Sequence, residues 1–323
     1  MFKNVLKASV AAVTLSLGLV AAAPALALDS MKILVPANPG GGWDQTARAL
    51  QAAMQADSIV RKVSVDNRGG AGGTIGLSQF VNGAKGDGSA TLMGGMVMVG
   101  AIVSNKSPVN LTQVTPLARL TGESLVVVVP ASSKVQTLKE LVDQLKANPG
   151  SVSFGGGSFG GSDHILAGLI AKAVGVDPSK VNYIAYSGGG EAQAAIMGGH
   201  VAAGISGYGE FQAQIKSGKL RALGVSSAER IEGEPVPTLK EQGVDVELIN
   251  WRALFGAPGI TEAQRQELIA ALDKAVVTTS WKEALKRNDW ADVYLRGDEF
   301  AKFLEADSAR VSKLVTELGI GKK

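Results

Sequence analysis

The chain contains 323 residues, with no cysteine and two histidines, which excludes disulfide bonds, thiolate metal sites and multi-histidine metal centres. Its formal net charge is +3, and it has no block of basic residues of the kind that binds nucleic acid. We therefore expect no nucleic-acid partner, no metal and no other cofactor.

The first segment of the chain has the pattern of a secretory signal peptide. Lys3 and Lys7 form a short basic start, an apolar run follows, and Ala-Leu-Ala at 25–27 is typical of a cleavage site. The uninterrupted apolar part, 8–23, is short for a membrane-spanning helix and is followed by a proline. The sequence therefore predicts a signal peptide over 1–27 and an exported, periplasmic protein.

After residue 27, short apolar segments alternate with amphipathic ones. The segment 124–130, SLVVVVP, is a β-branched run that predicts a strand buried on both faces. The predicted strands lie at 31–36, 62–67, 89–95, 124–130, 151–155, 181–186, 201–206 and 220–227. The predicted helices lie at 43–57, 73–84, from 137 to the Asn-Pro-Gly stop at 148–150, and at 163–174, 191–197, 261–277, 280–287 and 298–318, with a further short helix between the strands at 201–206 and 220–227.

This order of elements indicates the fold class. Repeated strand–helix–strand units are typical of parallel sheets with helices on both faces. The units restart after Pro130, and chains of roughly 300 residues tend to form two cores. The sequence therefore predicts an α/β fold with two doubly wound lobes in close contact and a ligand cleft between them.

Glycine is concentrated where predicted strands end and helices begin. Clusters stand at 40–42, 69–73, 155–161 and 188–190. Ligands of open α/β sheets bind at these carboxyl ends, and glycine lets a ligand approach main-chain amides closely. The unpaired N–H groups and partial positive charge at the start of the following helix favour an anion. The clusters therefore predict a cleft for a small anion, with plain strand-to-helix turns as the alternative.

The stretch GGGSFG at 155–160 fits two other motifs. It matches the dinucleotide pattern G-x-G-x-x-G, but the next predicted strand ends in Tyr-Ser rather than in an acid. It also contains G-x-S-x-G, which would make Ser158 the nucleophile of a secreted serine hydrolase. A triad would then need His164, in the following helix, or His200, at the opposite edge of the sheet. We interpret both histidines as surface or cleft-wall residues and keep the hydrolase as the alternative function.

Two acids follow glycine clusters closely. Asp44 comes after the first cluster and Asp163 after the third. An acid at a helix start can cap the helix and complement its dipole. It can equally accept a hydrogen bond from a ligand hydroxyl, an amine or an ordered water. For Asp44 the sequence leaves both roles open.

Several stretches together resemble one known family. They are VPANPGGGWDQTAR at 35–48, VDNRGGAGGTIG at 65–76, YSGGGEAQAAIMGGHV at 186–201 and KLRALGVSS at 219–227. They resemble the substrate-binding receptors of tripartite tricarboxylate transporters, also called Bug or TctC-type receptors, and the resemblance extends over nearly the whole mature chain. It implies a type II periplasmic-binding-protein fold and a receptor that is not an enzyme. Such a receptor binds a small carboxylate, a citrate-like tricarboxylate or a dicarboxylate, and delivers it to a permease.

The resemblance also implies a division of the chain and its partners. Lobe 1 would consist of 28–123 plus 220–323 and lobe 2 of 124–219, with 124–130 and 220–227 as the strands that cross between them. The partners would be a small organic acid and the membrane permease subunits of a tripartite tricarboxylate transporter. We expect the receptor itself to be a monomer.

In this family the carboxylate is held largely by backbone amides of glycine turns and by bridging waters. The resemblance implies no catalytic residue and no metal ligand. Trp43 is closer to the tricarboxylate-type branch, whereas Glu191 and Ala202 stand where many members carry proline and an acid. The implied ligand-binding residues are Gly40, Gly41, Gly42, Trp43, Asp44, Gly72, Gly73, Thr74, Ser158, Phe159, Gly160, Gly161, Asp163, Ser187, Gly188, Gly189 and Gly190.

Overall fold

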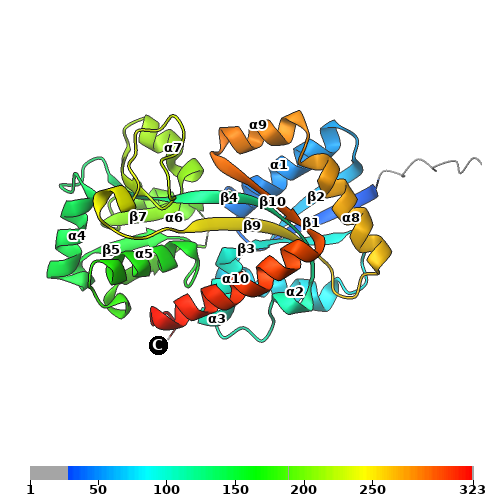
Figure 1. The fold of residues 1–323 in the computed structure, drawn as a ribbon, viewed down its shortest axis with the longest axis horizontal. Coiled ribbons are helices and arrows are strands. Elements are labelled where there is room, and N and C mark those ends of the chain that lie inside the picture. The colour runs from blue at the N-terminus through cyan, green and yellow to red at the C-terminus, as the bar shows by residue number, and fades with distance from the viewer. Residues whose placement is uncertain (1–27, 188, 322–323) are drawn as a thin grey trace, which may run out of the picture.

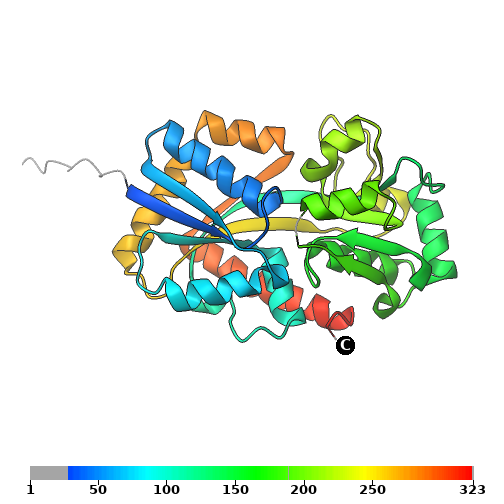
Figure 2. The same ribbon diagram turned by 180° about the vertical axis from the view of Figure 1, so that it is seen from behind.

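The computed structural model describes residues 28–187 and 189–321, so the predicted signal peptide at 1–27 lies outside the described residues. Two α/β lobes lie side by side, and long strands run from one lobe into the other (Figures 1 and 2). The chain begins in the first lobe, crosses to the second and returns to complete the first. The two-lobed α/β architecture predicted from the sequence is confirmed.

The helices and strands follow one another as predicted in most of the chain. The strands are β1 (Leu28–Val35), β2 (Val60–Asn67), β3 (Ala90–Gly95), β4 (Thr115–Pro130), β5 (Ser153–Gly156), β6 (Asn182–Ala185), β7 (Ala203–Gly207), β8 (Leu220–Val225), β9 (Ile249–Gly256) and β10 (Trp290–Arg296). The α-helices are α1 (Gly42–Ala56), α2 (Thr74–Gly83), α3 (Met96–Ser104), α4 (Leu138–Ala147), α5 (Ser162–Ala173), α6 (Gly189–Met197), α7 (Tyr208–Lys216), α8 (Glu262–Ala275), α9 (Thr279–Arg287) and α10 (Gly297–Glu317).

Strand β4 joins the two lobes. Its first part, 115–124, pairs antiparallel with β9 and β10, and its second part, 125–130, pairs antiparallel with β7 and β8. Neighbouring strands follow the order β2-β1-β3-β9-β4-β7-β5-β6. Because one strand donates and accepts hydrogen bonds in both halves, the lobes share a continuous sheet. Every residue from 120 to 130 is buried, as the apolar run predicts.

The outer strands of each lobe are parallel. In the first lobe β1 pairs with β2 and β3, and in the second β5 pairs with β6 and β7. Figure 1 shows α1 and α9 on one side of the first lobe's sheet and α10 on the other, which is the layered arrangement that alternating strands and helices predict. The carboxyl ends of these parallel strands point toward the other lobe, so the glycine turns that follow them face the region between the lobes.

The position of β8 corrects the boundary expected at residue 220. The resemblance made 220–227 a crossing strand, but β8 pairs with the second-lobe part of β4 over 126–130. The chain then stays beside the second lobe, where Leu248 N–H donates to the Ser226 carbonyl, and it returns to the first lobe as β9. By strand pairing, the second lobe therefore extends to about residue 248.

Three elements of the structure are absent from the sequence-based prediction. Helix α3 has the sequence MVMVGAIVS, which is apolar all round and offers no amphipathic period to recognise. Strand β9 has the sequence INWRALFG, whose asparagine and arginine interrupt the apolar run of a central strand. Strand β10, WADVYLR, lies between two helices and pairs with β4.

The core is continuous between the lobes. Leu92 in β3, Val127 in β4 and Phe154 in β5 belong to one cluster of buried apolar side chains. None of the helices in 28–187 and 189–321 is both long and apolar enough to cross a membrane.

Two valines test how far β4 supports this core. Val127 is fully buried, whereas Val277 is 64 % exposed. We expect Val127→Ala to lower the free energy of unfolding by roughly 1–3 kcal/mol, because it deletes two buried methyl groups and leaves a cavity. The matched change Val277→Ala should stay within about 0.5 kcal/mol of the wild type. Urea unfolding followed by circular dichroism measures both, and equal effects would contradict the role of β4.

Candidate ligand cleft

A cavity of about 240 Å³ lies between the lobes, where the glycine turns meet β7 and β9. Five helices begin at its wall. The residues at their N-terminal ends, Gly41 for α1, Gly73 for α2, Gly161 for α5, Gly189 for α6 and Gly207 for α7, all line it. Because a helix start carries unpaired N–H groups and a partial positive charge, the cavity wall is suited to an anion.

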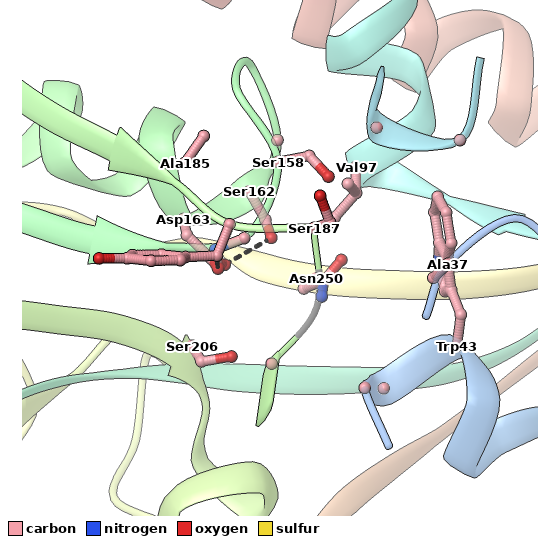
Figure 3. A pocket seen from close by; sticks show the side chains of 18 of the residues that line it. Ala37, Trp43, Val97, Ser158, Ser162, Asp163, Ala185, Ser187, Ser206 and Asn250 are labelled. Carbon is pink, nitrogen blue, oxygen red and sulfur yellow. Dashed lines mark hydrogen bonds between the residues drawn. The ribbon is translucent and has the colours of Figure 1, made fainter. Parts of the chain in front are cut away.

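The cavity brings together predicted residues from turns far apart in the sequence. Figure 3 shows Ser158 and Ser187 from the second lobe and Trp43 from the first lobe around the same space. The predicted residues that line the cavity are Gly41, Gly42, Trp43, Gly72, Gly73, Ser158, Phe159, Gly161, Asp163, Ser187 and Gly189. Gly188 lies outside the described residues.

Five predicted residues lie outside the cavity lining, and the structure gives most of them another task. The Gly40 N–H donates to Asp44, the Gly160 N–H donates to His164, and the Thr74 hydroxyl donates to the Ala71 carbonyl. These groups shape the turns rather than face the cavity. The five residues are Gly40, Asp44, Thr74, Gly160 and Gly190.

Asp44 has a structural position in the first turn. It is buried, and its carboxylate accepts hydrogen bonds from the Gly40 N–H at 2.9 Å, from Arg48 Nε at 3.0 Å and from Asn67 Nδ2 at 3.0 Å. Burial raises its pKa, but the hydrogen bonds from Arg48, Gly40 and Asn67 outweigh burial and leave the pKa lowered. The N-cap of α1 is Gly41, so Asp44 does not cap the helix, although it lies in the acidic first turn and complements the helix dipole. It also lies outside the cavity lining, and its hydrogen bonds order the turn, a role that the sequence did not indicate.

Asp163 stands at the cavity wall at the start of α5. Its carboxylate accepts the Gly157 N–H at 2.7 Å and the Ser162 hydroxyl at 2.9 Å (Figure 3). Burial raises the pKa of Asp163 to about 6, against the lowering effect of the Gly157 hydrogen bond. The side chain therefore fixes the 157–161 turn and places an acidic group beside the bound anion that the cavity would accept.

His164 corrects the sequence-based interpretation of a surface or cleft-wall residue, because it is buried outside the cavity lining. Its Nδ1 accepts the Gly160 N–H at 3.2 Å, and its ring stacks on Tyr183 with centroids 4.2 Å apart. Burial lowers the pKa of His164 to about 4, so the ring is neutral at pH 7. His200 is exposed, and no hydrogen bond joins Ser158 to either of these described histidines. The triad of the alternative hydrolase is therefore not assembled.

A buried charge cluster, defined as Arg252, Glu123 and Glu210, closes one side of the cavity. Arg252 in β9 forms an ion pair with Glu123 in β4, and its Nη2 lies 3.5 Å from Glu210 Oε1 in α7. The side chains of Arg252 and Glu123 are each 1 % exposed, and that of Glu210 is 12 % exposed. Burial raises the pKa of Glu123 and of Glu210, and the Arg252 guanidinium opposes both shifts.

Sequence reasoning missed this cluster, together with Asn250, which also lines the cavity. Asn250 is buried, its Oδ1 has no hydrogen-bond partner, and its side chain lies at the cavity in Figure 3. The signal that could have found these residues is the interruption of the apolar stretch INWRALFG by an amide and a guanidinium. Polar side chains in a central strand require partners, and here they face the cleft.

The fold and the cavity define a class of protein, the two-lobed solute-binding receptor. The family model of the tripartite tricarboxylate transporter family receptor matches residues 46–320. The chain belongs to this family. The family and the similar structures are binding proteins, so this chain is a binding protein and not an enzyme.

The chain is similar to individual proteins over most of its length. The chain is 30 % identical to BugT of Bordetella pertussis over 295 residues, which are 90 % of this chain and 89 % of BugT. The structure of the periplasmic binding protein BugD is similar with a TM-score of 0.81 and 23 % identity, covering 90 % of this chain and 98 % of BugD. MatC from Rhodopseudomonas palustris with bound malate has a TM-score of 0.80 and 23 % identity, covering 89 % of this chain and 99 % of MatC.

Because His164 is buried in its neutral form, we expect it to contribute to the loss of folding stability at acidic pH. The pKa falls from 6.5 to about 4 on folding, so the associated stability is present above pH 6.5 and is lost as the pH falls toward 4. At pH 5 the loss should reach about 2 kcal/mol. His164→Gln should remove this pH dependence while keeping an acceptor for Gly160. Urea unfolding at pH 7 and pH 5 compares the two proteins, and an unchanged pH dependence in the variant would contradict the assignment.

Substitution by alanine should affect folding stability differently at Gly42 and at Gly41. A methyl group at position 42 would overlap with the buried guanidinium of Arg252, whereas at position 41 the nearest atom is the Gly189 nitrogen at 3.5 Å. We expect Gly42→Ala to lower the free energy of unfolding by roughly 1–3 kcal/mol through overpacking. Gly41→Ala, at φ −83°, should change it by less than about 0.5 kcal/mol. Similar losses in the two variants would mean that Arg252 does not hold this turn.

Proposed function

We propose that this protein is an extracytoplasmic receptor that binds a small di- or tricarboxylate and delivers it to the permease of a tripartite tricarboxylate transporter. The observation that carries the proposal is the convergence of five helix N-termini from both lobes on one cavity. The backbone amides at helix starts are donors that suit a carboxylate. MatC, of similar fold, holds malate.

The size of the cavity supports a small ligand. A volume of about 240 Å³ lies below the range of pockets for drug-sized molecules, roughly 300–1,000 Å³, and suits an acid of a few carbons. The first lobe contributes the turns at 41–43 and 72–73, and the second contributes 157–159, Gly161 and the start of α6. A ligand held by donors from both lobes stabilises their closed arrangement, which is the usual switch of two-lobed receptors. The closed form would be the form that docks on the permease.

The receptor would meet its ligand outside the cytoplasm, after export. Receptors of this family are periplasmic binding proteins, as the BugD structure illustrates. Residues 1–27 would serve as the signal peptide that exports this chain, and the mature receptor would act as a monomer.

Isothermal titration calorimetry of the mature protein with succinate, malate, glutarate, adipate, tricarballylate and citrate tests the proposal. We expect one-to-one binding of at least one of these acids. Gly41→Pro should weaken that binding by roughly 10- to 100-fold, since a hydrogen bond to a charged group contributes about 1.5–3 kcal/mol. The φ of −83° at Gly41 is close to that of proline, so the change removes the N–H donor with little strain.

Gly41→Ala is the matched control, because it keeps the amide and fits the available space. It should bind the same acid with nearly the wild-type dissociation constant. If none of the six acids binds, the carboxylate function is wrong. If Gly41→Pro binds as tightly as Gly41→Ala, the first glycine turn is not a donor to the ligand.

A further inference from the structure

Glu210 lies at the joint between the lobes rather than on a free surface. It belongs to α7 of the second lobe, yet it lines the cavity together with Gly41 and Gly42 at the start of α1 in the first lobe. Arg252 Nη2 lies 3.5 Å from Glu210 Oε1. Glu210 therefore stands where a ligand carboxylate could otherwise approach the buried guanidinium.

The starts of two helices meet around this carboxylate. The backbone of α6 at Gly189 lies against the start of α1, since a methyl group at Gly41 would stand 3.5 Å from the Gly189 nitrogen. A methyl group built on Gly189 would overlap with Glu210 Oε2. One oxygen of Glu210 thus faces Arg252 while the other lies against the first turn of α6. The positive ends of both helices surround a negative charge that belongs to the protein itself.

The groups that face Glu210 leave the cavity with an excess of acid. Arg252 on β9 and Glu123 on β4 are already paired with each other. Asp163 on α5 also lies close enough to Glu210 for their charges to repel each other. Formal charges are therefore three acids against one guanidinium. A further carboxylate placed beside Glu210 would meet like charge and no free cation, which disfavours its binding.

We propose that Glu210 is a specificity-determining residue that occupies one carboxylate position of the cleft and thereby restricts the receptor to ligands with two carboxylates. The inference rests on the proposed function of binding a small carboxylate and names its ligand class. A third carboxylate finds the guanidinium of Arg252 already paired with Glu123 and Glu210. Beside the main-chain amides of the glycine turns, the cleft offers a ligand the buried amide of Asn250, whose Oδ1 has no hydrogen-bond partner and suits a hydroxyl donor.

Glutarate and tricarballylate form the decisive pair of probes, because they differ by the central carboxylate alone. Calorimetric dissociation constants of the wild type should favour glutarate by at least tenfold. Glu210→Gln keeps the shape of the side chain while removing its charge, and it should reduce this preference by roughly tenfold or more. Glu210→Ala, which leaves Arg252 paired with Glu123, provides the same test with the position vacated.

Glu234→Gln is the matched control, since the Glu234 side chain is also 12 % exposed, is paired with Lys216 and lies outside the cavity lining. Its ratio of the two dissociation constants should equal that of the wild type, and thermal unfolding checks that all variants are folded. A wild type that binds tricarballylate more tightly than glutarate, or an unchanged ratio in Glu210→Gln and Glu210→Ala, overturns the inference while the receptor function stands. If the wild type binds no carboxylate, the proposed function fails and this inference fails with it.

Discussion

The buried guanidinium of Arg252 is the interaction on which the joint between the lobes depends. It lies on β9 of the first lobe, pairs with Glu123 on β4, and approaches Glu210 on α7, so it connects the first lobe and the shared strand to a helix of the second lobe. Its position also leaves no room for a side chain at residue 42, where α1 begins. An isolated charge in this place would be costly, and its partners are therefore part of the fold as much as of the site.

This constraint links stability to recognition. Gly42 in the first turn is needed because the Arg252 guanidinium occupies the space that a side chain would take, and the absence of side chains in this turn exposes main-chain amides to the cavity. The turn is then ordered from behind by Asp44, which bonds to Gly40, Arg48 and Asn67. Main-chain amides arranged in this way recognise the charge of a ligand and the spacing of its carboxylates. The acidic side chains around them decide which anions are accepted.

Much of the fold could be predicted from the sequence, because it depends on patterns that are local. Neighbouring residues are enough to indicate the alternation of apolar strands and amphipathic helices, the buried run in β4 and the glycine turns. The all-apolar α3 and the interrupted strand β9 could not be read in this way, since their character depends on what packs around them. The boundary of the second lobe was misplaced for the same reason, because the pairing of β8 with β4 is a long-range contact.

The sequence by itself determined the two-lobed α/β class, the family and the turns that meet at the cleft, because each has a signature within a short stretch. The tertiary structure decided which groups of those turns face the cavity. In the folded chain the Gly40 N–H is bonded to Asp44 and His164 is buried against Tyr183. Folding also brings together Glu123, Glu210 and Arg252, which lie far apart in the sequence. The physical reason is that the energy of a buried charge depends on its neighbours in space, and sequence spacing does not specify them.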